Sequence, residues 1–523
     1  MMRPAPEGTM LLLNIDRSAA SPVYLQIARQ IQALIECGAL ATGAKLPATR
    51  SLARVLGVNR TTVCEAYQEL WALGYIESRP GSYTLVRERG RIVQPRDRPR
   101  VGAISWQEAV PRSRARFFAQ MRDFAASAHP AGKADEVNLS RLDMDSRLFP
   151  LEEFRRSLQR VFVRDGRLLL NYGEAQGYLP LREYLAERSR IHGLSVAASE
   201  VLVTNGSAQA IDLVFRLLAP RGETIAIESP TYANVIQVLQ YHGCRVLGIP
   251  VRQDGMDLGC LDRALHRSRP SFVYTMPNFQ NPTGVTTSQA HRERLLEICN
   301  RHRLPLVEDG FEEEMKYFGK VSLPIKSMDR HQVVIYMGTF SKVLFPGVRI
   351  GWIIADRECI QRLLAIKRMS DLSTTPLLQA ALCDFCRREL FDLHVRRMHR
   401  VFRKRMQTAL AALREHMPDG LVSWTEPAGG FLIWVTFRGR DVDERRFYQY
   451  CTAEGVRVSP GSFYYPAAGP ERCFRISISG LDEQEIGEGI RRLGRAVRRT
   501  AAVAPGPRAV SRVRARPVRT GPP

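Results

Sequence analysis

Short apolar runs rich in β-branched residues alternate with helical stretches through the middle of this chain, and no other feature limits the fold more. The runs cover residues 201–204, 224–227, 271–274, 306–307 and 333–336. A strand that is apolar at every position is buried on both faces, as happens when helices cover both sides of a parallel sheet. The alternation therefore predicts an α/β domain built on a mostly parallel sheet.

The pattern changes near Thr374. Helical spacing continues from there, and two further apolar runs follow at 431–435 and 473–478. These runs indicate a smaller α+β lobe that completes the same domain, which we place at residues 137–497.

The first 86 residues have a different organisation. Apolar residues recur at helical spacing over 22–38, a short helical stretch follows Pro47, and another begins near Asn59. Two short strand-like runs then flank a Pro-Gly turn. Three helices followed by a strand pair are typical of a winged helix-turn-helix, which we place at residues 20–86.

Composition bounds the remaining possibilities. A length of 523 residues exceeds what one hydrophobic core organises, so several domains are expected. No apolar run approaches the roughly 20 residues that cross a bilayer, which predicts a cytoplasmic protein without a membrane partner. Cys383 and Cys386 form a single C-x-x-C inside a helical pattern. A metal or redox role is the less favoured interpretation of this pair, and no metal site is expected.

The net charge of +23 is spread unevenly. Residues 87–136 are rich in Arg and Pro without a sustained period, which indicates a basic linker that contains at most some helix. The segment 498–523 carries seven arginines and no acid among Pro, Gly and Ala, the composition of a disordered basic tail. Non-specific contact with DNA and simple solvation are both open for that tail.

Residues 339–342, Thr-Phe-Ser-Lys, followed by Arg349, have the form of a lysine that anchors pyridoxal 5'-phosphate next to groups that hold its phosphate. Lys342 would form the imine bond with the cofactor. Thr339, Ser341 and Arg349 would bind the phosphate, the arginine through charge-assisted hydrogen bonds. A Ser-Lys pair with a downstream arginine is common, so the prediction depends on further partners elsewhere in the chain.

Those further partners occur in chain order. Ser207 and Ala208 begin a helix directly after a predicted strand, and free N–H groups at a helix start favour phosphate. Tyr232 would lie against the pyridine ring of the cofactor, and Asn281 would hydrogen-bond the cofactor's phenolic oxygen. Asp309 would keep the pyridine nitrogen protonated, although a solvated acid at a strand end is the alternative interpretation. The ordered set favours a pyridoxal 5'-phosphate site.

At these residues the chain resembles the fold-type I aminotransferases, and its segments 22–27 and 46–50 resemble the GntR class of regulators. One family combines both parts, and over residues 20–490 the chain is similar to the MocR-type regulators. The resemblance implies a GntR-like head, a fold-type I transferase domain that depends on pyridoxal 5'-phosphate, and a head-to-tail homodimer. By it, Arg475 would bind the α-carboxylate of a substrate or effector, with a structural role as the alternative. Tyr172 would reach the cofactor phosphate of the neighbouring subunit.

One position departs from the family pattern. The family has Asp-x-Tyr at the ring-nitrogen aspartate, whereas this chain has Asp309, Gly310 and Phe311. The phenol hydroxyl that would meet the cofactor's phenolic oxygen is missing, which argues against efficient transamination. Asn281 would compensate in part.

The head offers candidate DNA contacts. In winged helix proteins the N-terminal residues of the third helix enter the major groove, and Arg60 is the expected base reader. The resemblance to GntR proteins adds Arg50 on the preceding helix and Gly81 at the wing tip. A helical domain that docks another protein is the alternative interpretation. The residues of the third helix placed on DNA are Asn59, Arg60, Thr61 and Thr62.

Together these features predict a dimeric transcriptional regulator that binds a double-stranded DNA operator. Its aminotransferase-like domain would sense pyridoxal 5'-phosphate itself, or an amino acid or amine effector, and alter operator binding. The alternative is a working aminotransferase whose head is secondary or vestigial, because Lys342 and Arg475 permit that chemistry. A cofactor carrier without DNA function is a third and less supported interpretation.

Overall fold

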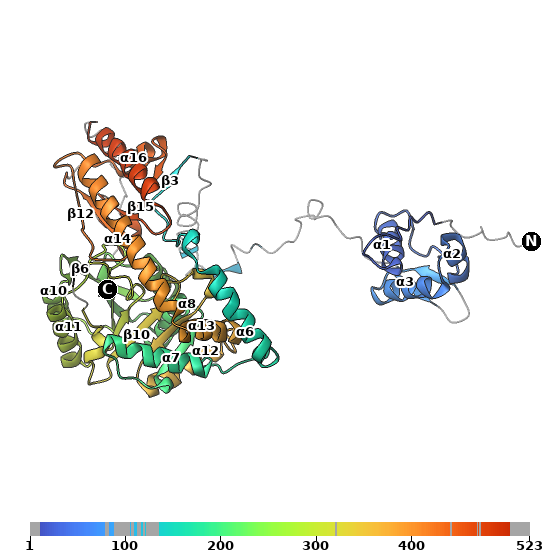
Figure 1. Cartoon of the computed structure of the whole chain (residues 1–523), viewed down its shortest axis with the longest axis horizontal. Coiled ribbons are helices and arrows are strands. Elements are labelled where there is room, and N and C mark those ends of the chain that lie inside the picture. The colour runs from blue at the N-terminus through green and yellow to red at the C-terminus, as the bar shows by residue number, and fades with distance from the viewer. Residues whose placement is uncertain are drawn as a thin grey trace, which may run out of the picture. The chain divides into compact units, whose positions relative to one another are not determined.

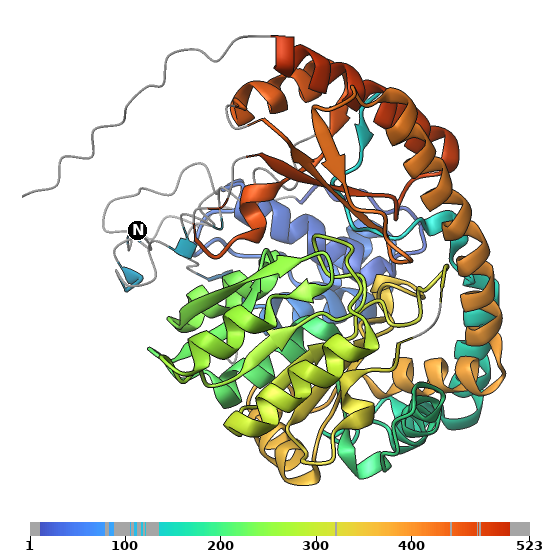
Figure 2. The same cartoon turned by 90° about the vertical axis from the view of Figure 1, so that its left-hand side faces the viewer.

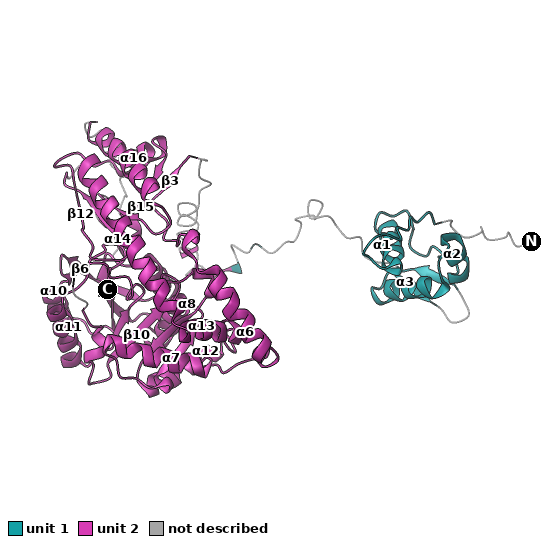
Figure 3. Cartoon of the chain, in the orientation of Figure 1, with its two compact units in different colours: residues 1–109 teal, residues 110–523 magenta. Residues whose placement is uncertain are grey.

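The computed structural model describes residues 11–78, 83–87, 105, 109–111, 117–118, 121, 135–319, 322–439, 442–467, 469 and 472–502. The chain divides into two compact units, residues 1–109 and 110–523 (Figure 3). Most of the predicted linker lies outside the described residues. Among the helices that the structure describes, none combines the length and the apolar character that a membrane crossing requires.

The first unit is a winged helix-turn-helix, as predicted. Its strands pair antiparallel, with Ile76 opposite Val86. Gly57, at φ 63°, ends the second helix in the left-handed conformation and lets the chain turn at once into the third. Ile27, Ile31, Leu52, Val63 and Leu70 are among the buried side chains of its own core. The elements are α1 (Val23–Glu36), α2 (Thr49–Leu56), α3 (Arg60–Ala72), β1 (Ile76–Ser78) and β2 (Thr84–Val86).

The second unit contains the predicted mostly parallel sheet, now seen to have eight strands. Two of its strands, β11 and β7, run antiparallel to their neighbours. The sequence did not predict β11 or the long strand β6. In sheet order the strands are β4 (Val201–Thr204), β11 (Gly351–Ile354), β10 (Val334–Thr339), β9 (Leu306–Asp309), β8 (Val273–Thr275), β5 (Thr224–Ser229), β6 (Arg245–Arg252) and β7 (Gly255–Met256).

Helices cover both faces of this sheet (Figure 1). Consecutive strand residues enter different cores: Leu306 packs against one helix layer and Val307 against the other. The uniformly apolar strands of the sequence follow from this double burial. The helices are α6 (Leu151–Leu169), α7 (Leu179–Ser189), α8 (Gly206–Leu218), α9 (Ala233–His242), α10 (Leu258–Leu265), α11 (Gln289–His302), α12 (Arg357–Arg368) and α13 (Pro376–Arg387).

A smaller α+β lobe completes the unit, as predicted. The 27-residue helix α14 (Leu390–His416) extends from the large part to this lobe (Figure 2). There it packs on α16 (Glu483–Ala502). The lobe also contains α15 (Glu444–Ala453), a sheet of β12 (Val422–Trp424), β13 (Leu432–Phe437), β16 (Cys473–Ser477) and β15 (Ser459–Pro460), and a parallel pair of β14 (Val456–Arg457) with β3 (Val137–Asn138).

The end of α16 corrects one boundary. The tail was predicted to be disordered from Arg498, but the helix continues to Ala502. The basic residues at the start of that segment therefore lie on a helix whose other face is buried against α14 and α15. The rest of the tail, 503–523, lies outside the described residues.

A buried ion pair holds α14 to the segment that precedes α6. Arg405 Nη2 lies 2.6 Å from Asp145 Oδ2, and the two side chains are 4% and 3% exposed. Burial by itself would raise the pKa of Asp145, but hydrogen bonds from Arg147 and Arg405 bring it below the ordinary value. The carboxylate is thus charged and depends on both arginines.

We predict that Arg405→Ala destabilises the protein by about 3–5 kcal/mol, because it leaves the Asp145 charge buried with one partner fewer. The neighbouring Lys404→Ala is the matched control. Lys404 is 73% exposed in its ion pair with Glu483, so its removal should cost less than about 1 kcal/mol. Chemical denaturation of both variants measures the difference, and equal losses would contradict the prediction.

Candidate functional site

A pocket lies where strands β9 and β10 end, and its space outside protein atoms amounts to about 330 Å³. Parallel strands present their carboxyl ends at one edge of a sheet, so residues that follow different strands converge there. Six of the residues proposed from the sequence meet in this pocket. Its lining consists of Leu142, Ser207, Tyr232, Met276, Asn281, Asp309, Phe311, Thr339 and Lys342.

Asp309 is the last residue of β9 and is 2% exposed. Its Oδ2 accepts a hydrogen bond of 2.6 Å from the Tyr274 hydroxyl on the adjacent strand β8. Its Oδ1 is buried and has no hydrogen-bond partner among the described residues. Burial raises the pKa of Asp309 to about 6. An orphaned carboxylate oxygen facing a pocket suits a protonated ring nitrogen.

Anion-binding groups converge beside the first turn of α8. Gly206 has φ +75°, and a Cβ there would lie 2.7 Å from Nη2 of Arg349. That nitrogen also donates to the Asn205 carbonyl at 3.1 Å. Only a glycine allows the arginine to lie this close to the amides that start the helix. Ser207 and Ala208 are the next two residues of this turn.

Thr339 ends β10, and Ser341 lies two residues after it. The hydroxyl of Thr339 donates to that of Ser341 at 3.1 Å, and both residues are buried. The structure therefore brings together the hydroxyls, the arginine and the helix start that the sequence assigned to one phosphate.

Lys342 reaches the pocket with its amine. Its Nζ donates to the carbonyl of Leu142 at 2.8 Å. Burial lowers its pKa, with an opposing contribution from Glu312. A lysine whose charged form is disfavoured supplies more of the neutral amine, which is the nucleophilic form.

Asn281 and Arg475, predicted separately, lie in contact. Arg475 donates to Asn281 Oδ1 at 3.1 Å and to the Ser140 carbonyl at 2.7 Å. Its guanidinium lies 5.1 Å from the ring centre of Tyr464. The Nε atom is buried without a hydrogen-bond partner among the described residues. The contact occupies the oxygen of Asn281 and directs its amide N–H₂ to other acceptors.

Phe311 keeps the doubt raised by the sequence, and Tyr172 is not part of the pocket. Phe311 is buried and lines the pocket, so an aromatic ring stands there without a hydroxyl. Tyr172 is 80% exposed and does not line the pocket.

Sequence reasoning missed Glu312. This residue is fully buried, and neither carboxylate oxygen has a hydrogen-bond partner among the described residues. Burial raises its pKa to about 8, although Lys342, the backbone at Phe431 and Arg475 oppose that rise. Gly430, at φ +67°, leaves the space that the carboxylate occupies. A run of three glutamates normally indicates a solvated surface, so nothing in the sequence distinguished this one.

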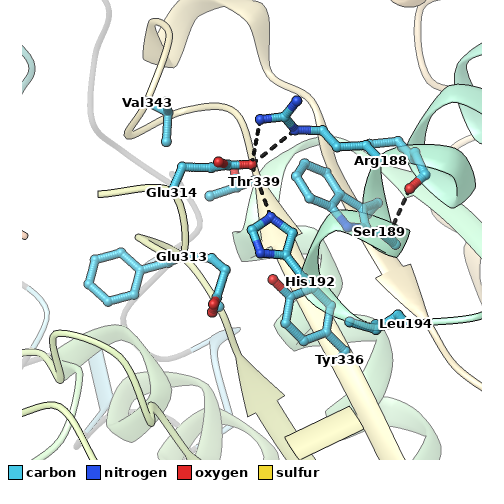
Figure 4. Close-up of a pocket in the computed structure, with 13 residues that line it drawn as sticks. Arg188, Ser189, His192, Leu194, Glu313, Glu314, Tyr336, Thr339 and Val343 are labelled. Atoms are coloured by element: carbon cyan, nitrogen blue, oxygen red, sulfur yellow. Dashed lines mark hydrogen bonds and ion pairs between the residues drawn. The ribbon is translucent and has the colours of Figure 1, made fainter. Parts of the chain in front are cut away.

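A second pocket, with about 470 Å³ of space outside protein atoms, shares Phe311 and Thr339 with the first, and Figure 4 shows residues that line it. There Glu314 accepts hydrogen bonds from Arg188 at 2.9 Å and from His192 at 3.4 Å. These two partners lower the pKa of Glu314 against the effect of its burial. These interactions hold in place the segment that follows β9.

The proposed DNA contacts of the head lie on its surface. Arg50, Asn59, Arg60 and Thr61 are exposed and Thr62 is half-buried. Asn59 also caps α3, because its side chain accepts from the backbone N–H of Thr61 at 3.3 Å. Gly81 lies outside the described residues.

The pocket residues fit pyridoxal 5'-phosphate: an orphaned buried carboxylate oxygen, an anion cradle and a buried amine occur at one sheet edge. When bound, this cofactor withdraws electrons from the α carbon of an amino compound. With the winged head, the site defines a DNA-binding regulator of the MocR type that uses pyridoxal 5'-phosphate.

Comparison with protein-family models shows which families the chain belongs to. The chain belongs to the class I and II aminotransferases, whose family model matches residues 135–493. The model of the gntR family of bacterial regulatory proteins matches residues 23–86.

Relatives fall into two groups. The chain is 30% identical to the probable rhizopine catabolism regulatory protein MocR of Rhizobium meliloti, over 92% of this chain and 95% of that protein. It is 36% identical to a 2-aminoadipate transaminase of Thermus thermophilus, over 67% of this chain and 87% of the relative. Among solved structures, the α-aminoadipate aminotransferase LysN of Thermus thermophilus, complexed with N-(5'-phosphopyridoxyl)-L-leucine, aligns with TM-score 0.70 at 32% identity. That alignment covers 76% of this chain and all of LysN.

We predict opposite effects of two glutamine substitutions on the cofactor-free protein. The pKa of Glu312 is raised from 4.5 to about 8, so its contribution favours the folded state at low pH and is lost as the pH rises from about 4.5 to 8. Glu312→Gln should therefore reduce this loss of stability with rising pH and stabilise the protein at pH 8 by about 1–3 kcal/mol.

Glu314→Gln is the contrasting variant. The lowered pKa of Glu314 means that its contribution is present above the unfolded-state pKa and lost as the pH falls. This substitution should lower the thermal midpoint at pH 7 and above. Melting curves between pH 5 and 8.5 measure both effects, and a loss of stability in Glu312→Gln at pH 8 would contradict the prediction.

Proposed function

We propose that this protein senses an amino acid or amine through its cofactor site and changes how its winged heads bind operator DNA. The observation that carries the proposal is the buried Arg475 beside the Lys342 pocket, with an unpartnered Nε. A buried guanidinium with free donor capacity suits the α-carboxylate of an amino acid. Because the same chain carries a DNA-binding head, the binding of an amino acid or amine would serve to regulate transcription.

Each pocket residue has a role in the proposal. Asp309 binds the ring nitrogen, Lys342 binds the aldehyde carbon, and Tyr232 lies against the ring. The phenolic oxygen accepts a hydrogen bond from the Asn281 amide. The phosphate is held by Ser207, Ala208, Thr339, Ser341 and Arg349, with Tyr172 contributed by a second copy of the chain.

A dimer is part of the proposal. Exposed apolar side chains gather on α6 and the residues after it, with two more following α12. Isolated exposed apolar residues are ordinary, but a concentration of this kind favours an interface with a second copy. Two heads per dimer would match a two-part operator, and DNA binding favours a cytoplasmic location. The exposed side chains are Leu151, Phe162, Val163, Leu168, Leu170, Tyr172, Met369 and Leu372.

A working aminotransferase is the second candidate function. The 36% identity to a 2-aminoadipate transaminase favours it, and the neutral amine of Lys342 can move a proton from the α carbon. Phe311 weighs against efficient turnover, because the hydroxyl that relatives place there is absent.

We predict that Arg60→Ala weakens operator binding about 10- to 100-fold and leaves cofactor absorbance unchanged. Arg60 begins α3 and is exposed at the end that enters the major groove. Arg29→Ala, an exposed arginine on the packing helix α1, is the matched control and should bind DNA as the native protein does. Titration of labelled operator DNA at several salt concentrations measures both. Equal loss of operator affinity in the two variants would mean that positive charge alone, and not the position of Arg60, determines DNA binding.

We also predict that amino acids change the cofactor absorbance of the native protein and shift its operator affinity about 5- to 150-fold. Lys342→Ala should retain the fold and operator binding but lose this amino-acid dependence. The experiment adds a panel of amino acids, with and without a keto acid. Repeated turnover with the keto acid would make the aminotransferase function primary, and unchanged regulation in Lys342→Ala would exclude cofactor-linked sensing.

A further inference from the structure

The helices α10 and α11 pack on each other (Figure 1). Two histidines and an aspartate lie together at the ends of these helices. Asp262 belongs to α10, His266 follows that helix, and His302 is the last residue of α11. Each offers one ligand atom, and these atoms lie within 4.8 Å of one another. None of the three lines the cofactor pocket.

Two of the ligand atoms are buried and lie close to each other. Asp262 Oδ1 and His302 Nε2 are buried, and neither has a hydrogen-bond partner among the described residues. They are 3.5 Å apart. Two ligands about 2.1 Å from a tetrahedral zinc ion are about 3.4 Å from each other, so the pair has the spacing of one edge of such a site.

His266 is held in the form that a metal requires. Its Nδ1 lies 2.8 Å from the backbone carbonyl of Asp262. A carbonyl oxygen only accepts, so Nδ1 donates and Nε2 of the neutral ring carries the lone pair. Metal-binding histidines are commonly oriented by a hydrogen bond of this kind. The ring of His266 is exposed and can close on an ion held by the other two residues.

One neighbouring cation must be considered. Arg301 Nη1 lies 3.5 Å from Asp262 Oδ1. The same arginine forms a closer ion pair with Glu297, at 2.9 Å, and is exposed. It can therefore stay with Glu297 while Asp262 binds a metal.

We propose that Asp262, His266 and His302 bind one divalent transition-metal ion of the zinc type, with water completing the coordination. Two imidazoles and one carboxylate are a ligand set that zinc accepts in proteins. The ion joins the end of α10 to the end of α11 and stabilises the folded chain, because binding to the folded state alone raises stability. This proposal is independent of the cofactor site and departs from the expectation of no metal site.

Zinc binding to the full-length holoprotein tests the proposal, with Co²⁺ as the spectroscopic probe. One equivalent of Zn²⁺ should bind and raise the thermal midpoint. His302→Ala and His266→Ala should each weaken binding at least about tenfold. Because His266 is exposed, its variant keeps the test valid if His302→Ala fails to fold.

His242→Ala is the matched control. His242 Nε2 also faces an aspartate oxygen, Asp212 Oδ1 at 3.3 Å, but no third ligand joins this pair within the described part of the chain. Its zinc affinity should equal that of the native protein. Three results would overturn the proposal: no zinc binding, equal binding by all variants, or a thiolate-to-cobalt absorption band, which would assign the metal to cysteines.

Discussion

The burial of charged groups at the carboxyl edge of the parallel sheet is the constraint on which the rest of the second unit depends. Asp309 and Glu312 are buried there, and burial raises the pKa of both carboxyls. Such groups are costly unless a partner arrives. The orphaned oxygen of Asp309 fits the proposed interaction with the ring nitrogen of the cofactor. Two helix layers bury each strand of the sheet on both faces and so make this buried edge possible.

The same edge explains why cofactor and effector chemistry meet in one pocket. Thr339 ends β10 and Lys342 follows it, Asp309 ends β9, and Arg475 lies on β16 of the smaller lobe. The contact between Arg475 and Asn281 joins the lobe to the large part through the site itself. An effector that binds Arg475 therefore acts at the junction of the two parts. Movement of one lobe against the other is a physical route by which occupancy could be signalled, since a ligand shifts only those states that it binds differently.

Regulation and catalysis draw on the same residues but differ in what must be stabilised. A sensor needs a bound state that persists, whereas an enzyme needs groups that favour the transition state and release the product. Phe311 in place of the family tyrosine removes one polar contact with the cofactor and keeps the apolar wall. Arg475, Lys342 and Asp309 are unaffected by that change. Under the proposed function, the chain would therefore retain recognition of an amino compound more completely than rapid turnover.

The sequence by itself determined the architecture and most of the pocket. Uniformly apolar runs predicted a sheet buried on both faces and helical spacing predicted the head, because these signals are local in the chain. The cofactor residues of the set around Lys342 were predicted from their residue types and their order along the chain. The sequence did not predict β6 or β11, the helical conformation of residues 498–502 at the start of the basic tail, or the burial of Glu312. Only the tertiary structure set Tyr274 against Asp309 and His302 against Asp262, because those contacts depend on which strands and helices become neighbours. Sequence spacing carries no record of that choice when residues far apart in the chain form the contact.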